Sequence, residues 1–463
     1  MTEKTPERPT LTAKEQPDSS DLDTVEATGA AASVGAVGTM GSSPGEYLRG
    51  YIKRVTGGDM GSLPAVGALI VLVLVFSVFE TGFFSLGNFA NLITQAAPGV
   101  LLAMGIVFTL LLGEIDLSAG TTSGVGGAIV AVLLHNASWP WPLACLAALV
   151  AGVVIGLLIG WMRTALHVPS FVSTLALFLG LQGVVILIVN SAHTQGNLQL
   201  SSDTLNALEN SNMPLWLGWV MAVICIVGFG AQKVTAVRAR TKRGLGAEPM
   251  VVAAAKVIGL AVIILVAVLL LNKNRALHQG TTIQPDATGK LVKVELPALQ
   301  GVPWVVPVII VLVVAFGFVL NRTRYGRHIY AVGGNDEAAR RAGIRVNAIR
   351  ISAFVICSSL AMVSGIVLAS ETGVNNGQGG GNTLLLAVGA AVVGGTSLFG
   401  GKGKITDAVI GGLVVAVIIN GMSDLLQGSN NAAWQAIVTG LVLLLAATVD
   451  ALSRKRADAS GLG

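Results

Sequence analysis

The chain has 463 residues, of which 53% are hydrophobic and only 11% are charged, and its mean hydropathy is +0.75. Soluble domains carry about 25% charged residues. The 46 residues between Asp116 and Arg163 include no Asp, Glu, Lys or Arg, whereas about 20 apolar residues suffice to cross a bilayer as a helix. These figures exclude a soluble enzyme and predict an all-α polytopic membrane protein.

The net charge of +5 is typical of a membrane protein that keeps Lys and Arg on its cytoplasmic loops, so we expect no nucleic-acid partner. Cys145, Cys225 and Cys357 lie in apolar stretches, and the five histidines are scattered without metal-ligand spacing. We therefore predict no disulfide, no metal site and no cofactor.

Residues 1–46 contain eight acidic and three basic residues and few groups that can be buried, which predicts disorder. The first apolar run begins near Pro64, too far along the chain for a signal peptide. The bases just before this run predict a cytoplasmic N-terminus. We expect a disordered cytoplasmic tail over 1–62, a membrane domain over 63–453 and a cytoplasmic C-terminal tail over 454–463.

Breaker residues divide the membrane domain into twelve apolar segments. They span 64–83, 89–112, 117–135, 143–162, 169–190, 214–231, 250–272, 304–321, 351–370, 384–399, 406–422 and 432–450. Twelve crossings place three basic clusters, at 233–243, 322–350 and 454–456, on the same side as the N-terminus, as the positive-inside rule requires.

Two of these segments are unusual. Segment 117–135 begins with LSAGTTSGVGG, and segment 384–399 is followed by GTSLFGGKGK. Such polar, Gly-rich backbone at membrane depth is typical of discontinuous or re-entrant helices. We therefore expect about 10–12 transmembrane helices, with these two segments discontinuous or re-entrant.

The loop 322–350 contains the strongest local pattern. Gly333-Gly334 predicts a turn, Asn335 or Asp336 an N-cap, and Gly343 a C-cap, with Glu337 and an Ala- and Arg-rich helix between them. A basic loop retained in the cytoplasm would explain the seven arginines of this loop but not a capped helix. We predict a short amphipathic helix on the cytoplasmic side.

The spacing of Glu337-Ala338-Ala339 and Gly343 resembles the EAA loop of ABC importer permeases. The preceding GRHIYAVGGN (326–335) resembles the branch of that family that imports ribose, xylose and related sugars. Further motifs follow the family order: EIDLS at 114–118, VPSF at 168–171, GGTSLFGG at 394–401 and NGMS at 420–423. The first and last of these are more similar to xylose permeases than to ribose permeases.

The resemblance implies a transport subunit, not an enzyme, of a multi-pass cell-membrane importer for a pentose or similar monosaccharide. It implies a homodimer with the translocation path for the sugar at the subunit interface. It also implies two partners, a separate dual-domain ATPase and an extracytoplasmic sugar-binding protein. It also implies that the loop helix docks on the ATPase. The residues assigned to this coupling are Gly333, Gly334, Asn335, Glu337, Ala338, Ala339, Arg341 and Gly343.

The Gly-rich runs at 118–127 and 394–403 lack the lysine of a phosphate-binding loop, so the energy for transport comes from a partner or from an ion gradient. An ion-coupled secondary transporter, with Glu114 or Asp116 as the proton site, is therefore an alternative. A channel is a third class, which the capped helix disfavours.

Polar residues within or beside the apolar segments are candidates for the translocation path or its gate. They are Glu114, Asp116, Ser118, Gln182, Asn190, Glu371, Asn375 and Asn420. Amides can donate to and accept from sugar hydroxyls, but each residue alone is also explained by an interhelical hydrogen bond. For Asp116 three roles stay open: capping the helix that follows, meeting sugar hydroxyls, or carrying protons.

Overall fold

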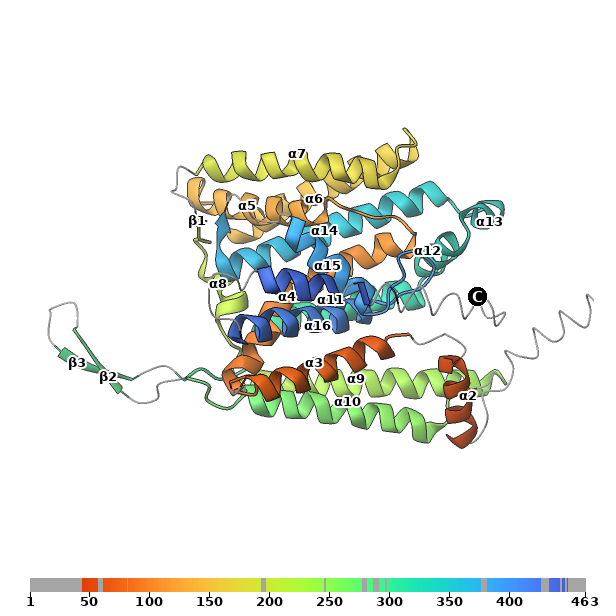
Figure 1. Ribbon diagram of the computed structural model, residues 1–463, viewed down its shortest axis with the longest axis horizontal. Helices are drawn as coiled ribbons and strands as arrows, with labels where there is room; N and C mark the ends of the chain where they lie inside the picture. Colours follow the sequence, from red (N-terminus) through yellow and green to blue (C-terminus); the bar gives the residue numbers. More distant parts are fainter. Residues whose placement is uncertain are drawn as a thin grey trace, which may run out of the picture. The chain divides into compact units, whose positions relative to one another are not determined.

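The computed structural model describes residues 44–56, 61–80, 82–192, 197–244, 247–276, 281–285, 291–295, 298–375, 381–425, 433–441, 444–445 and 448. The described chain is mostly helical (Figure 1). Residues 1–43 and 454–463, predicted to be tails, lie outside this part. Disorder up to residue 62 is a wrong prediction for 44–56, which form a helix because their apolar and basic residues separate onto two faces.

The helices, in chain order, are α2 (Pro44–Thr56), α3 (Leu63–Phe79), α4 (Leu86–Leu111), α5 (Ala119–Asn136), α6 (Trp141–Thr164), α7 (Ser170–Asn190), α8 (Asp203–Asn210), α9 (Leu215–Lys242), α10 (Met250–Leu271), α11 (Val305–Arg322), α12 (Arg324–Gly334), α13 (Asp336–Arg341), α14 (Val346–Thr372), α15 (Gly381–Val393) and α16 (Ile405–Leu425). The strands are β1 (Asn197–Leu198), β2 (Thr281–Pro285), β3 (Leu291–Glu295) and β4 (Val374–Asn375). β1 pairs with β4, and β2 with β3, both antiparallel.

Within the described residues, eight helices are long and apolar enough to cross a membrane: α4, α6, α7, α9, α10, α11, α14 and α16. The apolar helices α3 and α15 are shorter. These helices confirm the prediction of an all-α polytopic membrane protein, because each of them falls on a predicted apolar segment.

The two segments predicted to be discontinuous or re-entrant differ from each other. α5 is one continuous helix of 18 residues, so a discontinuous helix at 117–135, one of the two predicted alternatives, is wrong; its Gly, Ser and Thr residues are buried against other helices. α15 has only 13 residues, about 20 Å of helix, which is shorter than the roughly 30 Å hydrocarbon core. A non-helical stretch over 394–404 then leads into α16, which packs antiparallel on α15, with Ala390 beside Gly411 and Gly394 beside Asp407.

The chain divides into two compact units. The smaller unit contains residues 44–53 of α2 and residues 226–260, which form the end of α9 and the beginning of α10. The larger contains the remaining helices, and its most extensive packing is that of α14 against α6, α4 and α5.

Small residues on three helices allow the backbone of α14 to lie very close to its neighbours. A Cβ atom added to Gly156 of α6 would lie 2.5 Å from the Val355 Cα atom, and one added to Gly126 of α5 would lie 2.8 Å from the Met362 Cα atom. One added to Gly105 of α4 would lie 2.9 Å from a carbonyl oxygen of α14. Membrane helices associate through close packing of this kind rather than through a hydrophobic driving force. α14 is therefore the central helix of the larger unit.

Gly365 of α14 gives a test of this packing. A methyl group there would lie 1.7 Å from the Ser123 carbonyl oxygen of α5, so Gly365→Ala must displace one helix. Overpacking of this kind costs about 1–3 kcal/mol, and we expect a lower melting temperature of the purified protein in detergent. Gly183→Ala in α7 is the matched control, because nothing lies within 4 Å of its added Cβ; equal melting temperatures for the two variants would contradict the packing argument.

Candidate functional site

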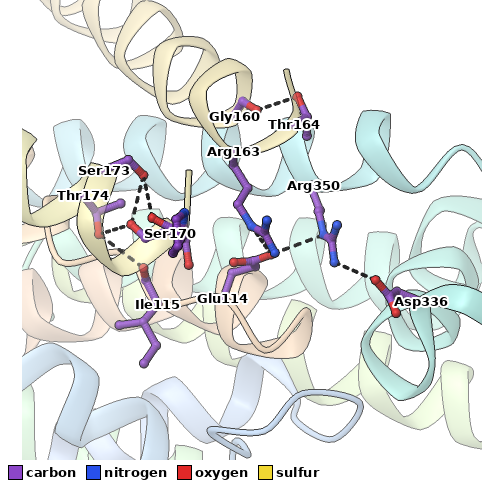
Figure 2. Close-up of polar contacts among 11 residues, drawn as sticks. Glu114, Ile115, Gly160, Arg163, Thr164, Ser170, Ser173, Thr174, Asp336 and Arg350 are labelled. Atoms are coloured by element: carbon purple, nitrogen blue, oxygen red, sulfur yellow. Dashed lines mark hydrogen bonds and ion pairs between the residues drawn. The ribbon is translucent and has the colours of Figure 1, made fainter. Parts of the chain in front are cut away.

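The connection between α4 and α5, residues 112–118, holds a buried carboxylate. Glu114 is only 5% exposed. Its Oε1 atom accepts a 2.8 Å hydrogen bond from Arg163 Nε, at the end of α6, and lies 3.2 Å from Arg350 Nε, in the first turns of α14. Arg350 also donates from Nη2 to Asp336, the first residue of α13, at 2.9 Å (Figure 2).

These two carboxylates and two guanidinium groups have a net charge of zero, and we call them the Glu114 network. It joins four elements that are distant in the sequence: the α4–α5 connection, α6, α13 and α14. Removing one partner of a buried ion pair leaves an uncompensated charge, which typically costs 3–5 kcal/mol. The network therefore fixes the beginning of α13 to the helix bundle.

The neighbouring residues of this connection are also held in place. Asp116 Oδ1 accepts from the Ser118 backbone N–H at 3.0 Å and from the Ser118 hydroxyl at 2.6 Å. Because α5 begins at Ala119, Asp116 closes the turn before the helix, and the expectation that it accepts from the backbone at this point is confirmed, although the helix does not begin at Leu117. Thr174 of α7 donates to the Ile115 carbonyl at 3.3 Å (Figure 2), so the helix that begins at Ser170 of the VPSF motif contacts the EIDLS motif here.

Glycines bring the GRHIYAVGGN and GGTSLFGG motifs to the same place. A Cβ added to Gly333, near the end of α12, would lie 1.8 Å from the Leu111 carbonyl oxygen and 2.8 Å from the Gly401 nitrogen. The Gly401 N–H donates to that same Leu111 carbonyl at 2.9 Å. Tyr330 of α12 donates from its hydroxyl to the Gly403 carbonyl at 2.7 Å. The end of α4, the end of α12 and the loop after α15 are thus in backbone contact.

The predicted loop helix is present as α13, with the predicted caps. The Asn335 side chain accepts from the Ala338 N–H at 2.9 Å. At the other end Gly343 has φ of +81°, its N–H donates to Arg340, and Ile344 donates to Ala339. This pair of bonds around a left-handed glycine is the Schellman motif, which ends a helix sharply.

Two details of the coupling prediction need correction, and a third is borne out. Gly333 and Gly334 are the last residues of α12 rather than a turn, because the 324–334 stretch is itself helical and only Asn335 separates it from α13. Ala339 is buried, so of the two alanines only Ala338 is exposed. Glu337 and Arg341 do form the expected i,i+4 pair, at 3.1 Å on the exposed face.

The eight residues predicted for the translocation path are not brought together. Glu114, Asp116 and Ser118 lie at the end of the bundle where α14 begins, whereas Glu371 and Asn375 lie where it ends. Arg350 and Glu371 are 21 positions apart on α14, which is about 31 Å along a helix. Gln182 is half-buried on α7, and Asn190 is the last residue of that helix. Asn420 is buried on α16, where its amide donates to Gln95 of α4 at 3.2 Å.

At the end of the bundle where α14 ends, the segment 197–210 folds onto that helix. β1 pairs with β4, which carries Asn375. Asn210 of α8 donates to the Ser370 carbonyl at 2.7 Å. Glu209 is 8% exposed, and neither of its carboxylate oxygens has a hydrogen-bond partner. Burial, together with the negative charge of Glu371, raises the pKa of the Glu209 carboxyl to about 9.

Sequence reasoning missed Arg163, Arg350 and Glu209. The positive-inside rule explained both arginines without assigning them partners, and only the fold brings them to Glu114. Glu209 lies in a polar segment, 191–213, that resembles an ordinary exposed loop. Its burial follows from the packing of α8 on α14, for which the sequence carries no local signal.

A bundle of helices long and apolar enough to cross a membrane, with the α12–α13 pair tied to its core by ion pairs and backbone contacts, defines a polytopic membrane protein. The chain belongs to the family described as the permease component of the branched-chain amino acid transport system, which matches residues 88–447. The resemblance to a permease family drawn from the motifs is thereby confirmed.

Several curated relatives are similar over most of their length. The xylose transport system permease protein XylH of Escherichia coli (strain K12) is 32% identical over 84% of this chain and 92% of its own. The XylH protein of Haemophilus influenzae is 31% identical over 84% and 96% of the two chains. The ribose import permease protein RbsC of Escherichia coli (strain K12) is 28% identical over 83% and 91%. No solved structure matches the chain.

The Glu114 network gives a first prediction for this site. Glu114→Gln leaves the two guanidinium groups of Arg163 and Arg350 with Asp336 as the one remaining carboxylate of the network, and we expect a lower melting temperature together with easier proteolysis of the 335–343 segment. Glu337→Gln is the matched control, since Glu337 is exposed and surface pairs contribute at most about 1 kcal/mol. Unchanged proteolysis of the segment in Glu114→Gln would show that the network does not hold α13.

Glu209 gives a prediction about pH. A raised pKa means that the folded protein keeps a proton that the unfolded chain has released, so the packing of α8 weakens as the pH rises from about 4.5 towards 9. Glu209→Gln should remove this dependence. Hydrogen–deuterium exchange of residues 203–210, corrected for intrinsic rates, should increase between pH 6 and pH 9 in the wild type but not in this variant.

The control for this experiment is Asp203→Asn, which changes an exposed acid on the same helix. It should retain the wild-type response to pH. If Glu209→Gln also retained it, the burial of the Glu209 carboxyl would not control the packing of α8.

Proposed function

We propose that this chain is the transmembrane subunit of an ATP-binding-cassette importer for xylose or a closely similar pentose. The observation that carries the proposal is the joint similarity to xylose and ribose permeases over more than four-fifths of the chain. The identity to the xylose permeases exceeds that to the ribose permease, which favours xylose as the substrate. The subunit forms the translocation path and performs no covalent chemistry.

The proposal includes three partners. A separate, dual-domain ATPase supplies the energy, an extracytoplasmic binding protein delivers the sugar, and a second copy of the chain completes the path at a subunit interface. Both termini and the α12–α13 pair lie in the cytoplasm, and the protein resides in the cell membrane. The basic residues at 322–350 support this orientation, because Lys and Arg accumulate on cytoplasmic loops.

The geometry supports a route for coupling. The ATPase binds the exposed face of α13, which contains Glu337, Ala338 and Arg341. The Schellman turn at Gly343 and the ion pair of Asp336 with Arg350 make α13 a rigid extension of α14. A displacement of α13 therefore reaches Glu114, and with it the connection that leads into α5.

The residues that line the translocation path are assigned from their burial and their hydrogen bonds. The Oδ1 atom of Asp116 accepts from Ser118, so we assign this pair a structural role beside the path, whereas the buried Oδ2 atom of Asp116 has no hydrogen-bond partner and stays a candidate acceptor. Gln182, Asn190, Glu371, Asn375 and Asn420 are retained as candidates for contact with the sugar or for the gate. Among them Asn420 has a buried Oδ1 atom without a hydrogen-bond partner, which leaves an acceptor for a sugar hydroxyl.

An ion-coupled transporter, the alternative function, finds no support. Its proton site would be Glu114 or Asp116, yet Glu114 is paired with two guanidinium groups, and one oxygen of Asp116 accepts from Ser118. The curated relatives named above are permease proteins of transport or import systems.

The energy source and the substrate can be tested together. The chain, co-expressed with its ATPase and sugar-binding protein and reconstituted in vesicles, should take up labelled xylose only when ATP is supplied. Uptake should survive an uncoupler, and an excess of unlabelled xylose should compete better than ribose. Uptake that needs a proton gradient and no ATP would refute the proposal, and a preference for ribose would refute only the choice of sugar.

Docking of α13 on the ATPase has its own test. A side chain at Gly343 disfavours the left-handed conformation by about 1–2 kcal/mol and adds bulk beside α13, where the added Cβ meets no atom of the chain. Gly343→Leu should leave the subunit inserted in the membrane, yet reduce ATPase co-purification and uptake by tenfold or more. Gly244→Leu is the matched control, because Gly244 is also exposed, with φ of +65°, and follows α9; equal losses in both variants would refute docking at α13.

A further inference from the structure

Helix α2 has two chemically different faces. At 100° per residue, Tyr47, Leu48, Tyr51 and Ile52 fall on one side, and Glu46, Arg49 and Lys53 fall on the other. The apolar side is not buried by the described part of the chain: Leu48 is 57% exposed, Ile52 52% and Tyr51 38%. A helix with a large apolar face and a basic face is the form that lies in the plane of a membrane surface.

Contacts within the smaller unit show at which level of α9 and α10 helix α2 lies. Lys256, in the second turn of α10, donates to the Tyr47 hydroxyl at 3.2 Å and lies 5.4 Å from the centre of its ring. Glu248, just before α10, pairs with Lys256 at 2.5 Å and with Lys233 of α9 at 3.9 Å. α2 is therefore held where α9 and α10 leave the apolar part of the bilayer.

The direction of α2 agrees with this position. α2 runs across the ends of α9 and α10 rather than along them (Figure 1). Since those two helices cross the membrane, a helix lying across their ends is close to the plane of the bilayer. Tyrosines such as Tyr47 and Tyr51 are enriched at this interfacial depth, and a lysine such as Lys256 can extend its amine towards it.

The same region is strongly basic. Residues 44–56 contain three basic residues and one acidic residue, and residues 226–260 contain six basic residues and one acidic residue. Together these nine bases and two acids give a net charge of +7. Arg49, Lys53, Arg238, Arg240, Lys242 and Arg243 are all exposed. Anionic lipid headgroups attract basic segments at the membrane surface.

We propose that α2 is an interfacial helix that binds anionic phospholipids, with Leu48, Tyr51 and Ile52 inserted among the acyl chains. Arg49 and Lys53, together with the exposed bases at the end of α9, contact the lipid phosphates. This role is independent of the transported sugar and of the energy source. It ties the beginning of the described chain to the bilayer and gives the permease a preference for the lipids that surround it.

The test measures which lipid lies next to α2 in the full-length chain. Leu48→Cys is labelled with a fluorophore in a background in which Cys145 and Cys225 are replaced by alanine, whereas Cys357 is fully buried. The protein is placed in nanodiscs that contain a small fraction of headgroup spin-labelled phosphatidylglycerol or phosphatidylcholine. We expect at least twofold stronger quenching by the phosphatidylglycerol label, and a smaller difference at 500 mM salt than at 50 mM.

The variant Arg49→Glu/Lys53→Glu should abolish the difference between the two lipids. Arg324→Glu/Arg327→Glu, which reverses two exposed charges on α12, should leave it unchanged. Equal quenching by both lipids in the wild type would refute the anionic preference. Absence of quenching by either lipid would mean that water or a second copy of the chain covers this face, and would refute the interfacial position as well.

Discussion

The close approach of α14 to three neighbouring helices is the constraint on which the larger unit depends. Within a bilayer, apolar side chains gain little by leaving lipid for protein, so tight backbone contact must supply the association. The glycines of α4, α5 and α6 remove the side chains that would prevent this contact. The Gly- and Ser-rich beginning of α5 has the same explanation: its residues are small because α5 is packed among helices, not because its chain is broken.

Polar interactions are concentrated at the two ends of α14, where packing alone cannot fix the connecting segments. At one end the Glu114 network and the backbone contact of Gly333 with Leu111 join the α12–α13 pair to the helices that the proposed path requires. At the other end Ser370 donates to the Leu205 carbonyl of α8 at 2.7 Å. A displacement of α13 would therefore reach the most extensively packed helix of the unit.

Apolar segments and capping residues could be read from the sequence because both are local. The boundaries of α7, α10 and α11 lie within a residue or two of their predicted positions, and Asn335 and Gly343 cap α13 as expected. The partners of Glu114 could not be predicted, because an ion pair across 49 residues with Arg163 depends on how α4 and α6 pack. A backbone acceptor role for Asp116 could be expected because its partner, Ser118, is only two residues away, although this contact closes a turn before α5 and does not cap a helix beginning at Leu117. The burial of Ala339 and Glu209 also depends on tertiary contacts.

Because both ends of α14 are pinned, its length sets a fixed dimension for the protein. Arg350 and Ser370 are 20 positions apart, about 30 Å along a helix, which equals the thickness of a typical hydrocarbon core. A helix held at both ends cannot tilt on its own to suit a thinner or thicker membrane. Any hydrophobic mismatch must therefore be absorbed by the surrounding lipid or by the less buried helices, such as α7 and α11.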